Sequence, residues 1–427
     1  MVSGVLDAED ASSVRPSVSV RGYDVLVLDA SLRQALVSAR ALGQQGLSVV
    51  ALDTDKQAPT FASRWCQKSF ISSVPAGSEA YLTFLEHALE QTRARVVIPS
   101  ADGTVALLRR YRTRLEQRVN VALAGEEALA VAVNKEQTLD IAQRLGLKVP
   151  QGIVVRSTAE VREALKDVGL PAVVKPVESW LWNRGQQGER LASLLVTTPE
   201  EARQAVEALT ASGGSTLFQK FLSGRREAIS LLYARGNVYA CFAQWAKRTE
   251  PPLGGQSVWR QSIAIPPDIG KQAEQLVREI DLDGYSEVEF RRDHVGVPYL
   301  MEINPRLSAS VEVAVRSGVD FPCLLYRWAC GERLEKIEHY QTGVWMRYLK
   351  GDIMTTIEAL QQRGRPGVTP PVQAILDFWL AFFVPAGYDY FDWRDCMPAI
   401  KASADFTRSW VGGAVIKRLL RLKRRFS

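Results

Sequence analysis

The sequence predicts a chain of the combined classes α/β and α+β, in which an open parallel α/β domain precedes a larger region built on antiparallel sheets. Three observations support this prediction. The chain has 427 residues, which is too long for one small module and suits two to four domains. Near its start, apolar runs alternate with helical patterns, as in the β-α-β units of a parallel sheet. Further on, strand-like runs follow one another across short glycine-containing turns, as in antiparallel hairpins.

The composition is that of an ordinary globular protein. Hydrophobic residues make up 46% and charged residues 23%, which excludes a mostly disordered, collagen-like or coiled-coil chain. No apolar run is long enough for a membrane-spanning helix, and the first ten residues lack the basic and apolar regions of a secretory signal. The five scattered cysteines form no C-x-x-C pair, so they indicate reduced thiols in a cytoplasmic protein.

The first predicted domain covers residues 21–125 and follows a loose arm over residues 1–20. Its apolar run YDVLVLDA is typical of a strand that is buried on both faces, and the next strand-like run follows a helical pattern. The strands expected here lie at 23–30, 47–55 and 94–103, and the helices at 33–42 and 79–92. This unit lacks G-x-G-x-x-G, so the dinucleotide-binding fingerprint is absent.

The second predicted domain covers residues 126–335 and includes a smaller lid at about 150–220. Local signals mark its elements: Pro150 stops the first helix, Ser157 with Glu160 forms a capping box, and Gly296 marks a turn. Helices are expected at 134–146, 158–168, 199–211 and 269–281, and strands at 152–157, 171–176, 191–198, 216–222, 227–235, 238–245, 285–293 and 297–306. The segment TEPPLGGQS is too rich in Pro and Gly to be an element.

A C-terminal region follows over residues 336–414. After a helix at 322–331 that enters it, we expect a strand at 342–352. The aromatic-rich stretch at 375–395 is expected to pack on the body of the protein; contact with lipid headgroups is the alternative.

The excess positive charge lies in the last eleven residues, KRLLRLKRRFS, which hold six of the 53 basic residues. The other 47 balance 47 acidic residues, so the body is neutral and a nucleic-acid-binding surface is not expected. As a helix, the tail at 415–427 would be amphipathic and would suit an anionic membrane surface or a partner's groove. A solvated, frayed terminus is the alternative. We therefore expect a cytoplasmic protein, which is peripheral at the inner membrane face if the tail binds lipid.

Three oxygen-bearing side chains are predicted to converge on two neighbouring strands. Glu302 and Asn304 lie two residues apart in a strand and so point to one face, and a turn brings Glu289 on the preceding strand beside them. Such oxygen donors, with room left for phosphate and water, suit Mg²⁺, and the guanidinium of Arg306 suits a phosphoryl group. The alternative is a surface hairpin with ordinary charges. However, Glu302 lies in an apolar run, where an unpaired carboxylate is costly.

Two lysines stand at positions that an anion would explain. Lys175 lies inside the buried strand PAVVKP, and Lys135 opens a helix, where a cation gains nothing from the helix dipole. Bound phosphate would account for both, although either alone is equally well a surface lysine whose stem covers apolar neighbours. Walker-type, nucleophile-elbow and zinc-protease motifs are missing, and the three histidines lie far apart in the sequence.

Taken in order from Val25 to about Gly331, these segments resemble the ATP-grasp superfamily, of the type found in carbamoyl phosphate synthase large chains and biotin carboxylases. VLVLDA…GLSVVALDTD is similar to the α/β domain that precedes the ATP-grasp fold, and NKEQTLDIAQRLGLKVP resembles the entry to the nucleotide domain. The resemblance implies a pre-ATP-grasp domain followed by an ATP-grasp fold with antiparallel sheets.

The resemblance also implies the binding of ATP with one or two Mg²⁺ ions, or Mn²⁺ instead. It implies that Glu289, Glu302 and Asn304 are the metal ligands. The expected nucleotide contacts are Lys135, Lys175, Gly185, Gly188, Gln219, Lys220, Phe221, Leu222 and Glu227. Gly185 and Gly188 belong to VESWLWNRGQQGERLAS, which departs from the family's Gly- and Ser-rich loop, and their backbone amides are expected to cradle phosphate.

The activity implied is that of a carboxylate–amine ligase, which activates a small-molecule carboxylate as an acyl phosphate and transfers it to an amine. Arg306, Lys175 and Arg260 are the expected catalytic residues, with Arg260 gripping the acceptor carboxylate or the acyl phosphate. Ser308 and Ser310 are expected beside them. The alternatives are a kinase-like ATP-grasp phosphotransferase and a nucleotide-binding regulatory or scaffold protein with decayed catalysis. A homodimer is an open option.

Overall fold

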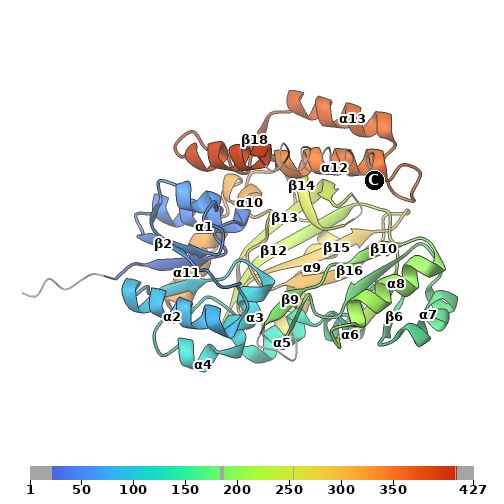
Figure 1. The fold of residues 1–427 in the computed structure, drawn as a ribbon, viewed down its shortest axis with the longest axis horizontal. Coiled ribbons are helices and arrows are strands. Elements are labelled where there is room, and N and C mark those ends of the chain that lie inside the picture. Colours follow the sequence, from blue (N-terminus) through green and yellow to red (C-terminus); the bar gives the residue numbers. More distant parts are fainter. Residues whose placement is uncertain (1–21, 183–186, 253, 409, 411–427) are drawn as a thin grey trace, which may run out of the picture.

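The computed structural model describes residues 22–182, 187–252, 254–408 and 410 (Figure 1). The predicted N-terminal arm and basic tail therefore lie outside the described residues. The first sheet has five parallel strands in the order β3-β2-β1-β4-β5, as the sequence predicts for this part of the chain. Its strands are β1 (Val25–Leu28), β2 (Val49–Asp53), β3 (Cys66–Ile71), β4 (Val96–Ile98) and β5 (Asn120–Val121).

Helices cover both faces of this sheet because successive side chains of a buried strand point to opposite sides. Leu26 and Leu28 pack in one core with α2 (Glu79–Thr92), and Val25 and Val27 pack in another with α1 (Arg33–Gln44). The edge strand β3 escapes prediction because its sequence CQKSFI is half exposed and has no apolar run. Short helices α3 (Asp102–Arg110), α4 (Arg112–Leu115), α5 (Glu126–Val133) and α6 (Lys135–Arg144) lead to the next sheet.

The second sheet has four antiparallel strands in the order β10-β7-β11-β6. The helices α7 (Val161–Val168) and α8 (Pro199–Thr210) share a small separate core with this sheet. The strands are β6 (Gly152–Val155), β7 (Ala172–Pro176), β10 (Leu194–Val196) and β11 (Thr216–Lys220), and a hairpin of β8 (Trp180–Trp182) and β9 (Gly188–Arg190) lies between β7 and β10 in the chain.

The third and largest sheet carries most of the candidate site. Its order is β16-β15-β12-β13-β14-β17-β18, and all neighbours are antiparallel except β17 and β18. Its strands are β12 (Arg226–Ala234), β13 (Asn237–Glu250), β14 (Gln256–Ile263), β15 (Gly284–Arg292), β16 (Pro298–Asn304), β17 (Trp345–Arg347) and β18 (Ala386–Tyr388). Residues of α9 (Pro267–Glu279) pack on one face, and α10 (Glu312–Arg316) and α11 (Phe321–Ala329) contribute to the core on the other.

The C-terminal region differs from prediction in two places. The strand expected at 342–352 is limited to β17, because Leu349 already begins the helix α12 (Leu349–Gln361). The aromatic-rich stretch forms α13 (Pro371–Leu380), a 3-10 turn (Ala381–Phe383) and β18, and many of its apolar side chains are exposed instead of packed on the body. Figure 1 shows α13 as the outermost element on its side of the molecule. Within the described ranges, no helix is both long enough and apolar enough to span a bilayer.

Candidate active site

The acidic cluster predicted from the sequence lies on the edge strand β16 and its neighbour β15. Their register places Glu289 opposite Glu302 and Glu287 opposite Asn304. The amide nitrogen Nδ2 of Asn304 lies 3.2 Å from Oε1 of Glu289 and 3.4 Å from Oε1 of Glu302. The structure therefore brings together all three side chains that the sequence suggests as metal ligands.

Positive charges surround this cluster. Nζ of Lys135 lies 3.6 Å from Oε2 of Glu302 and donates a hydrogen bond of 2.9 Å to Oγ of Ser179. Arg226, at the start of β12, makes two contacts with the carboxylate of Glu289, one of them 3.0 Å from Nε to Oε2. Although burial pushes the pKa of Glu302 upward, the charges of Lys135 and Lys175 outweigh it and hold that pKa below its usual value.

Lys175 is the more unusual of the two lysines. It lies on β7 with 8% of its surface exposed, and no acceptor among the described residues is within hydrogen-bond distance of its ammonium. Burial lowers its pKa to about 8, although the nearby carboxylate of Glu302 acts in the opposite direction. A buried ammonium without a close partner is costly, so the position is suited to an anionic ligand.

Glu287 is a site residue that the sequence reading missed. It lies two residues before Glu289, so it shares the same face of β15, and this alternation in SEVEF is the signal that was available. Nε2 of Gln244 donates to Oε2 of Glu287 over 2.9 Å and to Oγ of Ser310 over 2.7 Å. Burial and the charge of Glu289 raise the pKa of Glu287 to about 7. These side chains line a small polar pocket, which also includes Arg226.

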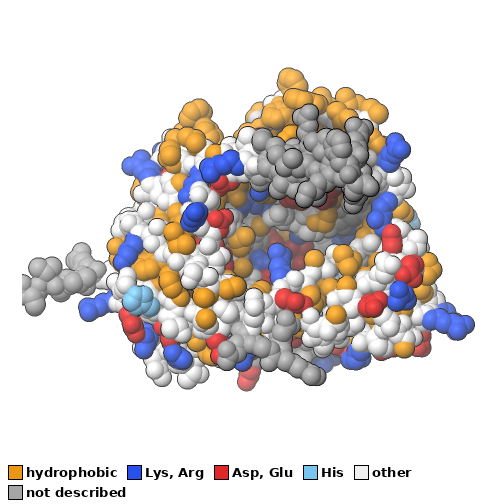
Figure 2. All heavy atoms as spheres, viewed as in Figure 1, with side chains coloured by type: hydrophobic (Ala, Val, Ile, Leu, Met, Phe, Trp, Pro, Cys, Tyr) orange, Lys and Arg blue, Asp and Glu red, His pale blue; other side chains and the backbone are white. Residues whose placement is uncertain are grey.

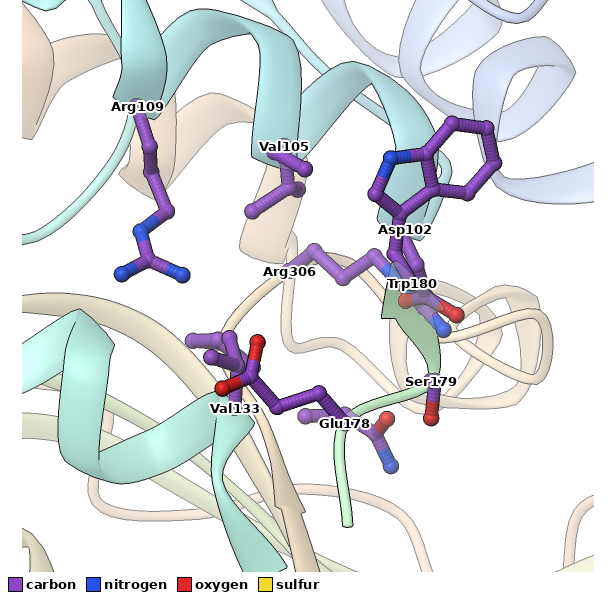
Figure 3. Close-up of a pocket in the computed structure, with 11 residues that line it drawn as sticks. Asp102, Val105, Arg109, Val133, Glu178, Ser179, Trp180 and Arg306 are labelled. Atoms are coloured by element: carbon purple, nitrogen blue, oxygen red, sulfur yellow. Dashed lines mark hydrogen bonds and ion pairs between the residues drawn. The ribbon is translucent and has the colours of Figure 1, made fainter. Parts of the chain in front are cut away.

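A second pocket lies where β16 ends (Figure 3). Asn304 and Arg306 line it together with Ser179, Trp180 and Asp102 of α3. Nε of Arg306 lies 2.6 Å from Oδ1 of Asp102, and this charge holds the pKa of Asp102 down despite its burial. Figure 2 shows that this face of the molecule is hollowed, with basic and acidic side chains on the floor of the hollow.

The segment from Gln219 to Glu227, called the hinge segment below, holds the predicted nucleotide contacts between β11 and β12 and contains a buried amide without partners. Gln219 is 1% exposed, and in the described part of the chain neither its Nε2 nor its Oε1 has a hydrogen-bond partner. The backbone N–H groups of Lys220 and Phe221 do not serve an outside acceptor, since they donate to the carbonyls of Gln151 and Pro171 over 2.8 and 3.2 Å. An unsatisfied buried amide costs about 1–3 kcal/mol, which a ligand that bonds to it would recover.

The other two hinge residues are engaged by arginines. The carbonyl of Leu222 accepts from Nη1 of Arg291 over 2.9 Å. The carboxylate of Glu227 lies between Arg225 and Arg292, at 2.9 and 2.7 Å. The charge of Glu227 is therefore compensated within the protein, whereas the amide of Gln219 has no hydrogen-bond partner among the described residues.

Known proteins similar to this chain include a family model, curated relatives and solved structures. A family model described as ATP-grasp in the biosynthetic pathway with Ter operon matches residues 215–352. The N-terminal section of the carbamoyl phosphate synthase large chain of Aquifex aeolicus is 24% identical over 320 residues, covering 71% of this chain and 55% of that protein. The chain thus spans about half the length of this curated relative.

Solved structures superpose on this chain over most of its length. Biotin carboxylase from Campylobacter jejuni, in a β,γ-ATP complex, superposes with a TM-score of 0.61 at 18% identity, covering 76% of this chain and 74% of that chain. N5-carboxyaminoimidazole synthetase from Staphylococcus aureus, complexed with ADP, gives 0.60 at 14% identity, covering 84% of this chain and 97% of that chain. The chain has the ATP-grasp fold. The predicted fold class is confirmed, as is the resemblance to the carbamoyl phosphate synthase and biotin carboxylase type.

Of the two glycines expected to cradle phosphate, the structure describes only Gly188. Gly185 lies outside the described residues. The N–H of Gly188 donates to the carbonyl of Gly77 over 3.2 Å, so it does not point at a ligand. Gly188 is needed instead for close packing, because a Cβ there would lie 2.2 Å from Nε1 of Trp180. Trp180 also packs on Gly77 and Gly103, where an added Cβ would lie 2.2 and 2.7 Å from its ring. The sequence alone does not reveal this role of Gly188, because Gly77, Gly103 and Gly188 lie apart in the chain and are brought together only by packing on Trp180.

Arg260 is also placed differently from the expectation. Its side chain has no exposed surface, and Nη1 and Nη2 both contact the carboxylate of Asp389, with Nη1 3.1 Å from Oδ2. Its Nε donates to the carbonyl of Ser310 over 3.2 Å. The structure therefore places this guanidinium in a buried salt bridge, not at a surface open to a substrate.

Of the serines and tryptophans near Arg260, the two serines lie at the polar pocket, and one tryptophan lies in the core. Ser310 lines the polar pocket, and Ser308 lies 3.0 Å from it, Oγ to Oγ. Trp259 is buried and stacks on Trp345 with ring centres 4.7 Å apart, so it belongs to the core. Trp245 is partly exposed, and the guanidinium of Arg225 lies over its ring.

Proposed function

We propose that this chain is an ATP-dependent carboxylate–amine ligase, which activates a carboxylate as an acyl phosphate and passes the acyl group to an amine. ADP and phosphate would be the other products. The observation that carries the proposal is the convergence of Glu289, Glu302 and Asn304 beside two buried lysines. The similarity of this chain to proteins that are named as ligases, synthases and synthetases supports it.

The residues of the cluster fit magnesium by their chemistry. In the described ranges, no three His, Cys, Asp or Glu side chains form a metal-binding group by themselves. Two carboxylates with the amide of Asn304 and phosphate oxygens are nevertheless a donor set of the kind that Mg²⁺ or Mn²⁺ takes. A half-turn of the amide exchanges its nitrogen and oxygen, so that the oxygen faces the carboxylates. One or two ions bound there would neutralise the charge on the transferred phosphoryl group.

The protein's own side chains would position the nucleotide and the reacting groups. Lys135 and Lys175 supply positive charge to the phosphates, and the orphaned amide of Gln219 supplies hydrogen bonds to the base. Arg306, held by Asp102 at the pocket that Asn304 lines, is the candidate contact to the transferred phosphoryl group. The polar pocket around Glu287 and Gln244 is the candidate place for the amine, because its carboxylate attracts an ammonium group.

In the second step the ammonium group would give up a proton, for which the carboxylate of Glu287 is the acceptor in the same pocket, and the amine nitrogen would then attack the acyl carbon. The C–N bond forms, the bond from carbon to the phosphate oxygen breaks, and phosphate leaves with the electron pair. Water must be excluded while the acyl phosphate exists, which is a task for the four-stranded sheet carrying Lys175 if it closes over the hollow.

The test is an ADP-release screen of the purified protein against pooled carboxylates and amines, followed by quantification of the amine. We expect ADP release that requires both pools and consumes amine in equal amount. Glu302→Gln should lower it by at least about a hundredfold, because it removes a charge that bears on the phosphoryl group. The control is Glu335→Gln, the same change at an exposed position.

Two other outcomes would replace the proposal. ADP release that needs a carboxylate or another acceptor but leaves the amine untouched would indicate a phosphotransferase. Binding of ATP without ADP release across the whole panel would indicate a regulatory or scaffold protein.

A further inference from the structure

The helix α13 presents its apolar side to solvent. In a surface helix, apolar residues at intervals of three and four form one stripe, and this stripe ordinarily faces the core. The residues at this spacing in α13 are Val372, Ile375, Leu376, Trp379 and Leu380. All five are exposed, including Val372 at 72% and Trp379 at 62%. The stripe continues in the following 3-10 turn with Phe383, which is 83% exposed.

The opposite side of α13 already has its own packing. Ala374 and Ala381 are buried, and the ring of Phe378 is contacted by the guanidinium of Arg347 at 4.7 Å. The stripe is therefore not a core face that happens to be loosely covered. Figure 2 shows hydrophobic side chains gathered at the top of the molecule, where Figure 1 places α13. Apolar patches of this kind on a folded chain mark an interaction surface.

The electrostatics indicate which surface would cover the stripe. Asp377 is the only acidic residue between 371 and 384, and it is partly buried. The chain outside the structure begins directly after Trp410, whose ring is 60% exposed, and runs to residue 427. These last seventeen residues include six Lys or Arg and no Asp or Glu. The exposed apolar stripe and the excess positive charge thus belong to the same end of a chain whose body is neutral.

We propose that the α13 stripe binds the surface of an anionic phospholipid bilayer. Aromatic and aliphatic side chains on one face of a helix insert at the boundary between headgroups and acyl chains, and cationic residues attract anionic lipid. Firm attachment of a peripheral protein takes two such signals, and this chain carries both. A second copy of the chain is less suited to the stripe, because it would bring six further positive charges to the same place.

The test is flotation of the full-length protein with phosphatidylcholine vesicles, with and without phosphatidylglycerol. We expect binding to vesicles that contain phosphatidylglycerol, and much less to the neutral ones. The double variant Trp379→Ser, Phe383→Ser should weaken binding by at least about tenfold, since it removes two exposed rings from the stripe. Removal of residues 415–427 should weaken it as well.

Val295→Ser is the matched control, because Val295 is 69% exposed in the turn between β15 and β16 and lies outside the stripe. Its binding should equal that of the wild type. Absence of wild-type binding would overturn the proposal, and so would a double variant that binds as well as the wild type. Light scattering supplies the other outcome: a wild-type dimer that the double variant splits into monomers, without vesicle binding, would assign the stripe to a second copy. None of these results depends on ligase activity.

Discussion

Two regions of the large sheet contain buried or partly buried carboxylates paired with arginine or lysine, and they differ in which polar groups are left without a hydrogen-bond partner. At the β14–β18 side, Asp389 accepts from both Arg33 and Arg260, and all three side chains are 5% exposed or less. At the β15–β16 side, Asn304 and Glu287 line the two pockets, and the carboxylates of Glu289 and Glu302 act on the ammonium of Lys175, which has no hydrogen-bond acceptor among the described residues.

The contrast separates a structural from a functional use of the same residue types. A closed salt bridge compensates its own desolvation and has nothing left to offer a ligand. In a cluster whose polar atoms lack partners, the desolvation cost remains uncompensated until a ligand binds to those atoms. Buried charge alone therefore does not identify a site; the candidate site differs from the Asp389 salt bridge in having the ammonium of Lys175, for which no described residue offers a hydrogen-bond acceptor.

The largest effect is expected where the pairing is complete. Asp389→Asn removes the carboxylate that faces Arg33 and Arg260, leaving two buried guanidinium groups without a counter-charge. We expect the free energy of unfolding to fall by about 3–5 kcal/mol. Urea denaturation followed by circular dichroism measures it.

Asp392→Asn is the control for this variant, since Asp392 forms its ion pair with Arg316 at the surface. It should cost no more than about 1 kcal/mol. Equal losses for the two variants would mean that the Asp389 pairing is not a closed structural unit, and the contrast drawn above would fail.

The sequence predicted the cluster whose residues lie on two strands that are consecutive in the chain, and it did not predict the salt bridge between distant segments. Glu289, Glu302 and Asn304 are joined by one turn, so strand alternation alone brought them together. Asp389 lies 129 positions after Arg260, so no local pattern related them, and Arg260 was taken for a ligand contact. The same limit applies to α13: its spacing predicts a stripe, but only the packing of its other side on Arg347 shows that the stripe faces outward.

A smaller effect is expected at Lys175, whose pairing is incomplete. Its pKa of about 8 means that its ammonium loses a proton between pH 7 and pH 9, so a positive charge near the proposed phosphate position is lost as the pH rises. We expect the affinity for ATP to fall by about tenfold across this range. Equilibrium binding of a fluorescent ATP analogue at several pH values measures it.

The matched variant is Lys175→Arg, because an arginine keeps its charge throughout this range. Its affinity for ATP should be nearly constant from pH 7 to pH 9. A variant that loses affinity in parallel with the wild type would assign the titration to another group and remove Lys175 from the phosphate site.

The smallest effect is expected at Gln219. There, one substitution should leave the stability of the free protein unchanged or raise it, and should lower the affinity for ATP. Gln219→Met keeps the length of the side chain but removes the two buried polar atoms that lack partners. The free protein should keep its stability or gain about 1 kcal/mol, because a desolvation cost disappears. The affinity for ATP should nevertheless fall by about fivefold, since the base loses hydrogen bonds.

Thermal denaturation with and without ATP measures both quantities, and Gln143→Met at an exposed position is the control. A variant that is destabilised while its affinity for ATP is unchanged would show that the amide serves the fold, which would place Gln219 with Asp389 on the structural side of the comparison.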